Sequence, residues 1–194
     1  MDASPDLLAV LSGPVEQVAP RLLGARLTHA GVTVRVTEVE AYAGPLDPGS
    51  HAYRGRTRRN AVMFGPAGHL YCYFTYGMHV CCNVVTGDEG DPSAVLIRAG
   101  EVVAGVDRAR ERRPGSTDRD LARGPARLCR ALALGLEHDG VDLVSGPVHL
   151  VPGKPAGAVS SGPRVGLRGA PDRPWRYWIT GERSVSAYRP AKSR

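Results

Sequence analysis

The chain has 194 residues, of which 42% are hydrophobic and 23% are charged, and its formal net charge is +6. These values are typical of an ordinary soluble globular protein with one domain and a sizeable core. The positive excess favours an anionic partner, with nucleic acid first, and the lack of a long apolar run excludes a transmembrane helix.

The cysteine pattern argues against both a disulfide framework and a zinc site. The four cysteines, none of which form a C-x-x-C pair, are Cys72, Cys81, Cys82 and Cys129. They predict buried free thiols in a reducing compartment.

Asp2 and Asp6 stand where a signal peptide carries positive charge, so we expect no signal peptide and a cytoplasmic protein.

Two short helices are predicted near the start of the chain. Residues 6–11 follow Ser4 and Pro5, which suit the cap and the first position of a helix. A second helix over residues 15–23 has apolar residues on one face and ends at Gly24. Both helices are expected to be scaffold.

Residues 32–42 predict a β-strand, because β-branched and polar residues alternate there. Three valines at alternate positions share one face, and strict alternation would place Glu38, Glu40 and Tyr42 on that same face. Either two carboxylates point toward the core or a β-bulge reverses the register. A carboxylate against an apolar wall, at a strand end that opens into a Gly/Pro loop, suits acid–base chemistry. The alternative is an exposed edge strand whose glutamates only add solubility.

The loop after this strand ends at His51 and leads into a cluster of arginines. The cluster comprises Arg54, Arg56, Arg58 and Arg59. Guanidinium groups match phosphate oxygens and release counterions, so beside a candidate catalytic strand the cluster predicts contacts with a nucleic-acid backbone. The alternative is that the four arginines are simply exposed to solvent and have no binding role.

A protruding β-hairpin is predicted where two β-rich runs flank Tyr76, Gly77 and Met78. Gly77 permits a tight turn, which puts Tyr76 at or near the tip. Tyr71 and Tyr73 share one face of the first strand. An exposed aromatic tip on a basic protein predicts insertion between stacked bases. The alternative is that the tyrosines pack on the core and leave their hydroxyls in water.

The second half of the chain predicts two more helices and several short strands. An apolar run at 94–97 predicts a buried strand closed by Arg98, whose charge would need Glu40 as its partner. Helices are predicted over 102–112 and 124–135, strands over 141–143, 148–151, 164–167 and 174–179, and a loop over 152–163. The chain 1–194 is therefore predicted to be one α+β domain, a curved and mainly antiparallel sheet with short flanking helices and a frayed tail at 188–194.

A series of motifs runs through nearly the whole chain. They are Glu38-Val39-Glu40-Ala41-Tyr42, Gly44-Pro45, His51, Arg59-Asn60, Met63-Phe64, Gly68-His69-Leu70-Tyr71-Cys72-Tyr73, Tyr76-Gly77-Met78, Asn83, Leu96-Ile97-Arg98-Ala99, Gly124-Pro125, Leu128-Cys129 and Arg164-Val165-Gly166. The series closely resembles the alkyladenine (3-methyladenine) DNA glycosylases, the alkylpurine type of animals and bacteria. The resemblance implies a monofunctional base-excision repair enzyme, which flips a damaged purine from duplex DNA and hydrolyses its N-glycosidic bond.

The resemblance also implies the catalytic residues. Glu40 matches the general base, which would activate a water for attack on the anomeric carbon and offset the oxocarbenium charge. Arg98 and the carbonyl of Val165 match groups that help hold that water. Alternation alone cannot separate Glu38 from Glu40, and the resemblance selects Glu40.

The same resemblance implies the base-binding residues. Tyr42, His51 and Tyr73 match side chains that sandwich the flipped base, and a base made cationic by alkylation suits such rings. Asn83 matches a residue that clashes with the exocyclic amine of guanine. Tyr76 matches the residue that fills the hole left in the duplex, which offsets part of the flipping cost.

No cofactor or metal is expected, since no metal-ligand spacing is visible and no lysine lies in the catalytic motif for a Schiff base. The expected partner is double-stranded DNA with damaged purines, bound by a monomer. The segment after Gly166 is shorter than in animal members, which leaves open the choice among 3-methyladenine, 7-methylguanine, hypoxanthine and ethenoadenine. Two alternative functions remain. One is a non-catalytic nucleic-acid-binding module, which would use the same aromatic residues and arginines. The other is a hydrolase of free nucleosides, but such a small substrate would need neither the arginine cluster nor the hairpin tip.

Overall fold

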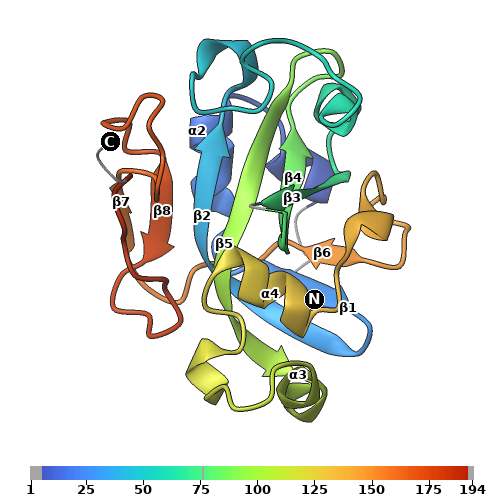
Figure 1. Cartoon of the computed structure of the whole chain (residues 1–194), viewed down its shortest axis with the longest axis vertical. Helices are drawn as coiled ribbons and strands as arrows, with labels where there is room; N and C mark the ends of the chain where they lie inside the picture. The colour runs from blue at the N-terminus through green and yellow to red at the C-terminus, as the bar shows by residue number, and fades with distance from the viewer. Residues whose placement is uncertain (1–5, 76, 192–194) are drawn as a thin grey trace.

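The chain is organised around one mostly antiparallel sheet in the computed structural model, which describes residues 6–75 and 77–191 (Figure 1). The described strands are β1 (Arg26–His29), β2 (Val32–Tyr42), β3 (Leu70–Thr75), β4 (His79–Thr86), β5 (Ser93–Ala104), β6 (His149–Val151), β7 (Val159–Gly162) and β8 (Arg176–Ile179). Their order is β3-β4-β5-β2-β1-β6, with β8 paired to β2 and β7. The predicted single α+β domain is confirmed.

Short helices flank the sheet. They are α1 (Leu7–Val10), α2 (Val15–Val18), α3 (Val106–Arg112) and α4 (Pro125–Ala131), with the 3₁₀ turns η1 (Ala19–Leu22), η2 (Gly44–Leu46), η3 (Ala61–Phe64), η4 (Asp118–Asp120) and η5 (Leu136–His138). In Figure 1, α4 lies in front of the sheet and α2 behind it. α4 packs on β4 and β5, and α2 packs on β2 and β5, so the sheet is covered on both faces.

The bulge that the alternation of β2 left open is present. Val36 pairs with Gly100 of β5, Glu38 with Ala99 and Val39 with Ile97, so the register shifts on both sides of Glu38. The valines at 32, 34 and 36 lie in the hydrophobic core, and after the bulge the core positions are Val39 and Ala41. The two glutamates are therefore turned to the opposite face. Both are completely buried, so the alternative of an exposed edge strand is wrong.

The bulge coincides with a change of partner along one edge of β2. β1 pairs with residues 32–35 of β2, and β8 pairs with residues 38–40. β8 therefore lies beside both glutamates within the sheet; its residue opposite Glu40 is Arg176, whose Nε donates to Glu38. A buried carboxylate needs such partners, since an unpaired charge away from water is costly.

Several predicted elements differ in the structure. β1 was not predicted. Residues 102–104, expected to begin a helix, continue β5, and α3 begins only after Gly105. Gly105 has φ = +72°, and a Cβ there would lie 2.0 Å from the carbonyl oxygen of Gly31, so the backbone breaks at this glycine. The helix expected to reach Gly135 ends at Ala131, since Ala133 takes a left-handed φ of +54°.

The later strands are also displaced. Residues 164–167 are irregular, and the strand lies instead at β7, inside the predicted loop 152–163. Residues 141–143 form only an isolated bridge between Asp142 and His69. At α1 the cap is Asp6, whose carboxylate accepts from the N–H of Leu8 at 3.2 Å. The predicted cap Ser4 and its neighbour Pro5 lie outside the described residues.

Two residues of the predicted frayed tail, Tyr188 and Arg189, contact the rest of the chain. Tyr188 lies 5.7 Å from the guanidinium carbon of Arg176, and the carbonyl of Arg189 accepts from Gly166 N–H at 2.8 Å. Residues 192–194 lie outside the described part. No helix within residues 6–75 and 77–191 has the length and apolar character needed to cross a membrane.

Candidate active site

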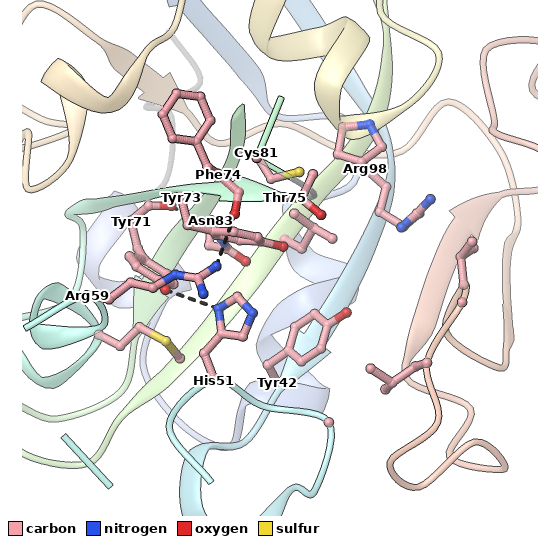
Figure 2. Close-up of a pocket in the computed structure, with 18 residues that line it drawn as sticks. Tyr42, His51, Arg59, Tyr71, Tyr73, Phe74, Thr75, Cys81, Asn83 and Arg98 are labelled. Carbon is pink, nitrogen blue, oxygen red and sulfur yellow. Dashed lines mark hydrogen bonds between the residues drawn. The ribbon is translucent and has the colours of Figure 1, made fainter. Parts of the chain in front are cut away.

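A cavity of about 640 Å³ opens where β2, the β3–β4 hairpin, β5 and the segment 165–167 meet. Figure 2 shows the rings of Tyr42, His51 and Tyr73 around it, with the ring of Phe74 turned away. The lining combines aromatic, aliphatic and a few polar side chains, as ligand pockets commonly do. The lining residues are Tyr42, Gly49, His51, Arg59, Met63, Tyr71, Tyr73, Phe74, Thr75, Gly77, Cys81, Asn83, Leu96, Arg98, Pro125, Val165, Gly166 and Leu167.

Glu40 lies beneath this cavity with its carboxylate fully buried. Its Oε2 accepts from the hydroxyl of Tyr42 at 2.8 Å, and its Oε1 accepts from the backbone N–H of Val165 at 2.6 Å. Arg98 Nη1 makes a longer contact of 3.4 Å to Oε2. Tyr42, Arg98 and Val165 all line the cavity, so these three donors connect the carboxylate to the cavity wall. The contact from Val165 is made by its amide, a role the sequence did not suggest.

Arg98 and Tyr42 both keep their protons beside Glu40. Burial lowers the pKa of Arg98, but the carboxylates of Glu40 and Glu38 raise it more, so the guanidinium remains cationic. Burial, and then the charge of Glu40, hold the pKa of Tyr42 well above its usual range. The phenol therefore remains a hydrogen-bond donor to the carboxylate.

The other rings form a connected wall. The ring centroids of His51 and Tyr73 are 4.5 Å apart at an interplanar angle of 82°, and Tyr71 stacks on Tyr73 at 5.6 Å. A hydrogen bond of 3.1 Å joins His51 Nδ1 and the hydroxyl of Tyr71 (Figure 2). Burial, and then the charge of Arg59, lower the pKa of His51, so its imidazole is neutral at pH 7.

Asn83 lies on β4 and is almost completely buried at the cavity wall. Its Nδ2 donates to the carbonyl of Tyr71 at 3.2 Å, which fixes the orientation of the amide. The strand pairing explains its position, because Asn83 faces Tyr71 on one side and Leu96 on the other. Asn83 is thus brought together with the predicted ring residues.

The arginine cluster does not behave as one unit. All four arginines are exposed, and Arg59 also borders the cavity. Arg59 lies 5.6 Å from the ring of Tyr73 and donates to the carbonyl of Phe74 at 3.1 Å.

Asn60 orders the arginine loop. Its side chain donates to the carbonyls of His51 and Gly55, each at 3.0 Å, and accepts from the N–H of Thr57 at 2.6 Å. The same contacts fix the position of His51 relative to the loop.

The hairpin is present, but its tip is only partly described. β3 and β4 pair from Leu70 to Thr75, and Gly77 has φ = +67°, as a tight turn requires. Met78 is 72% exposed. Tyr76, the predicted wedge, lies outside the described residues.

A buried ion pair beside the cavity was missed by sequence reasoning. Arg164 Nη2 donates to Asp47 Oδ1 at 2.8 Å, and neither side chain is exposed. Arg164 also donates to the carbonyl of Ala41 at 2.9 Å and lies 4.8 Å from the ring of Tyr42. The pair therefore ties the loop 43–51 to the segment that carries Val165.

The cysteines are buried free thiols, as predicted. Cys81 borders the cavity, but burial raises its pKa to about 11, so it is a neutral thiol and a poor nucleophile at pH 7. Within the described residues, no three His, Cys, Asp or Glu side chains group as a metal site would need.

Comparison with known proteins identifies the family to which the chain is similar. The model of a family described as methylpurine-DNA glycosylase matches residues 9–183. Three relatives carry the name "Putative 3-methyladenine DNA glycosylase". The one from Leifsonia xyli subsp. xyli is 52% identical over 96% of this chain and 93% of its own length. Those from Frankia casuarinae and Streptomyces avermitilis are 50% and 51% identical, over 98% and 97% of this chain and 96% and 93% of their own lengths.

Taken with the fold and the cavity, these matches define a DNA glycosylase, an enzyme that hydrolyses N-glycosyl bonds. The chain belongs to the methylpurine-DNA glycosylase family. The resemblance seen in the sequence motifs is confirmed, and the alternative of a non-catalytic binding module is set aside.

Proposed function

We propose that the enzyme extrudes a damaged purine from duplex DNA into the cavity and that Glu40 is the general base for its removal. Glu40 takes a proton from a water, the water oxygen bonds to the anomeric carbon, and the purine leaves with the electrons of the N-glycosidic bond. The observation that carries the proposal is a buried carboxylate with three donors, set directly under a ring-lined cavity. In this low-dielectric setting the negative charge would stabilise a developing oxocarbenium ion.

The residues predicted to hold the water and the base border the cavity, which supports the roles proposed for them. Arg98 and Val165 both contact Glu40 and are proposed to hold the attacking water beside it. Tyr42, His51 and Tyr73 are proposed to stack on the extruded purine. A cationic alkylated base suits these rings, because their faces are electron-rich and the imidazole is neutral.

Duplex DNA is the proposed partner, bound by a monomer acting on the bacterial nucleoid in the cytoplasm. The exposed arginines 54, 56 and 58 are proposed to contact phosphates, since exposed guanidinium groups match phosphate oxygens. Arg59 is proposed to contact DNA near the cavity mouth. Gly77 and Met78 would approach the duplex at the hairpin turn, with Tyr76 as the wedge.

The test is base release from duplex oligonucleotides that each carry one lesion: 3-methyladenine, 7-methylguanine, hypoxanthine or ethenoadenine. We expect release of at least one alkylated purine, with no strand cleavage. Release from free nucleosides at a similar rate would favour the alternative of a nucleoside hydrolase. Release from none of these duplexes would contradict the proposal.

The neutral imidazole of His51 leads to a pH prediction. Burial lowers the pKa of His51 from its ordinary value of about 6.5, so the imidazole becomes cationic only in acidic solution, where it would repel a cationic base. We expect the affinity for a 7-methylguanine duplex to fall roughly tenfold relative to a hypoxanthine duplex between pH 7 and pH 5. The measurement is Kd by fluorescence anisotropy with the Glu40→Gln variant, which slows base release enough for binding to be measured.

The matched variant for this pH experiment is His51→Gln. Since glutamine does not titrate, the ratio of the two Kd values should then stay constant with pH. A ratio that falls equally in both proteins would exclude His51 as the cause.

Asn83 leads to a selectivity prediction. Its amide is fixed by the bond to the Tyr71 carbonyl and cannot turn away from a bulkier purine. In Asn83→Ser the side chain is smaller, so release of 7-methylguanine relative to 3-methyladenine should rise about tenfold. Competition between the two lesions in one reaction measures this ratio directly, and an unchanged ratio would remove Asn83 from the selectivity argument.

A further inference from the structure

The last described segment of the chain lies against the buried glutamates. We call residues 184–189 the C-terminal strap. Ser186 donates to Glu38 twice, from its N–H to Oε2 at 2.7 Å and from its Oγ to Oε1 at 3.0 Å. Ser184 Oγ donates to Thr37 Oγ1 at 2.9 Å, so the strap is bonded to β2 at the bulge itself. The strap follows the part of the chain that the family model matches.

Glu38 is completely buried and holds two arginines as well as the strap. Arg176 Nε donates to its Oε1 at 2.6 Å, while Arg176 Nη2 donates to the carbonyl of Ser186 at 3.2 Å. Arg98 Nε contacts the same Oε1 at 3.3 Å. The strap, β8 and β5 therefore meet at a single carboxylate.

The contact with Glu38 determines how Arg98 reaches Glu40. A guanidinium beside one carboxylate tends to form two parallel bonds to it. Here Nε is engaged by Glu38 and only Nη1 reaches Glu40, at 3.4 Å. Glu38 thus prevents Arg98 from pairing with both oxygens of Glu40, which leaves that carboxylate free to accept a proton.

The strap also supports the other side of Glu40. The carbonyl of Arg189 accepts from Gly166 N–H at 2.8 Å, and the preceding residue, Val165, donates its N–H to Glu40. Arg123 Nε donates to the carbonyl of Val185 at 2.8 Å, which fixes the middle of the strap. One segment thus braces both the arginine and the amide that contact the proposed base.

We propose that Glu38 and Ser186 are positioning residues of the active site, which act on Glu40 through Arg98. This inference rests on the proposed role of Glu40 and deepens it. Neither residue borders the cavity, and the carboxylate of Glu38 is engaged by Arg98, Arg176 and Ser186, so neither residue is assigned a contact with the substrate.

The test compares Glu38→Gln, Ser186→Ala and Ser186→Thr with the wild type in single-turnover base release at enzyme excess, well below Tm. Misplacing a catalytic contact by a fraction of an ångström lowers the chemical rate while binding persists. We expect a ten- to hundredfold loss for Glu38→Gln and several-fold for Ser186→Ala, with Kd for the duplex within twofold. Ser186→Thr keeps the hydroxyl and should restore the rate.

The matched control is Ser145→Ala, because Ser145 Oγ also donates to a carboxylate, that of Asp142 at 2.7 Å, but on the exposed surface. It should release base at the wild-type rate. Wild-type rates in both Glu38→Gln and Ser186→Ala would overturn the inference, as would a loss in Ser186→Ala that Ser186→Thr does not recover. If Glu38→Gln does not fold, the two serine variants decide. A wild-type rate in Glu40→Gln would instead contradict the proposed function.

Discussion

Replacing Glu40 by glutamine is expected to lower single-turnover base release by about 10²–10⁴-fold, the range that general-base catalysis contributes. An amide cannot take a proton from water, and it carries no charge to offset the oxocarbenium ion. The fold should tolerate the change. The amide oxygen can accept from Val165 N–H, and the amide NH₂ can donate to the oxygen of Tyr42. The longer contact from Arg98 is lost, but Arg98 keeps its ion pair with Glu38.

Binding and rate together make this experiment decisive. Affinity of Glu40→Gln for a lesion-bearing duplex should match that of the wild type, since the rings and the arginine loop are unchanged. The control is Glu89→Gln on the exposed turn after β4, which should have no effect. Normal release by Glu40→Gln would mean that another group activates the water.

The secondary-structure elements around the cavity that were predicted correctly are those whose pattern lies within a short stretch of sequence. The strand at 32–42 was predicted with its observed bounds, and the β3–β4 hairpin was predicted from two apolar runs around a glycine. Alternation could not decide on which face Glu38 and Glu40 lie, because a bulge depends on the pairing with β5. The resemblance to a known family, not the alternation, selected Glu40.

The elements that were misplaced are those whose conformation is set by distant neighbours. β7 has the sequence Val-Ser-Ser-Gly, which carries no strand pattern, and it exists because β8 pairs with it. Residues 102–104 satisfy a helical pattern but remain in β5 because β2 pairs with them up to Ala104. Local propensity was overridden by tertiary pairing in both cases.

The ion pair of Asp47 and Arg164 was beyond sequence reasoning for a related reason. The two residues are 117 positions apart, and no periodic pattern connects them. Asp47 stands in a Gly/Pro loop, where aspartate usually serves a turn, and its oxygens do accept from Ala43 and Gly49 N–H. Only the fold reveals that the same carboxylate neutralises a completely buried arginine.

Asp47→Asn should therefore destabilise the protein strongly. The substitution keeps the shape of the side chain but leaves the charge of Arg164 buried without a counterion, which costs about 3–5 kcal/mol. For a chain of this length, that lowers Tm by roughly 10 °C. Thermal unfolding followed by circular dichroism at pH 7 measures the change.

The pH dependence supplies a second signature of the same pair. Burial alone would raise the pKa of Asp47, but the hydrogen bonds and charge of Arg164 outweigh it and hold the pKa below its usual range. The folded state therefore binds this proton less readily than the unfolded state, so the stabilisation is complete above about pH 4. It is lost as pH falls through the lower, folded-state pKa, and this loss should be absent in Asp47→Asn.

Burial, and not the geometry of the pair, is the expected source of the effect, and the chain offers a control that separates them. Arg164 donates to both oxygens of Asp47, from Nη1 and Nη2. Arg110 likewise donates to both oxygens of Asp118, from Nε and Nη2 at 2.9 and 2.8 Å, but on the exposed surface. Water screens such a pair, so Asp118→Asn should leave Tm nearly unchanged. Equal shifts in Tm for Asp47→Asn and Asp118→Asn would show that the buried pair contributes no more than a surface pair. The link between loop 43–51 and the segment of Val165 would then have to depend on the apolar contacts around it.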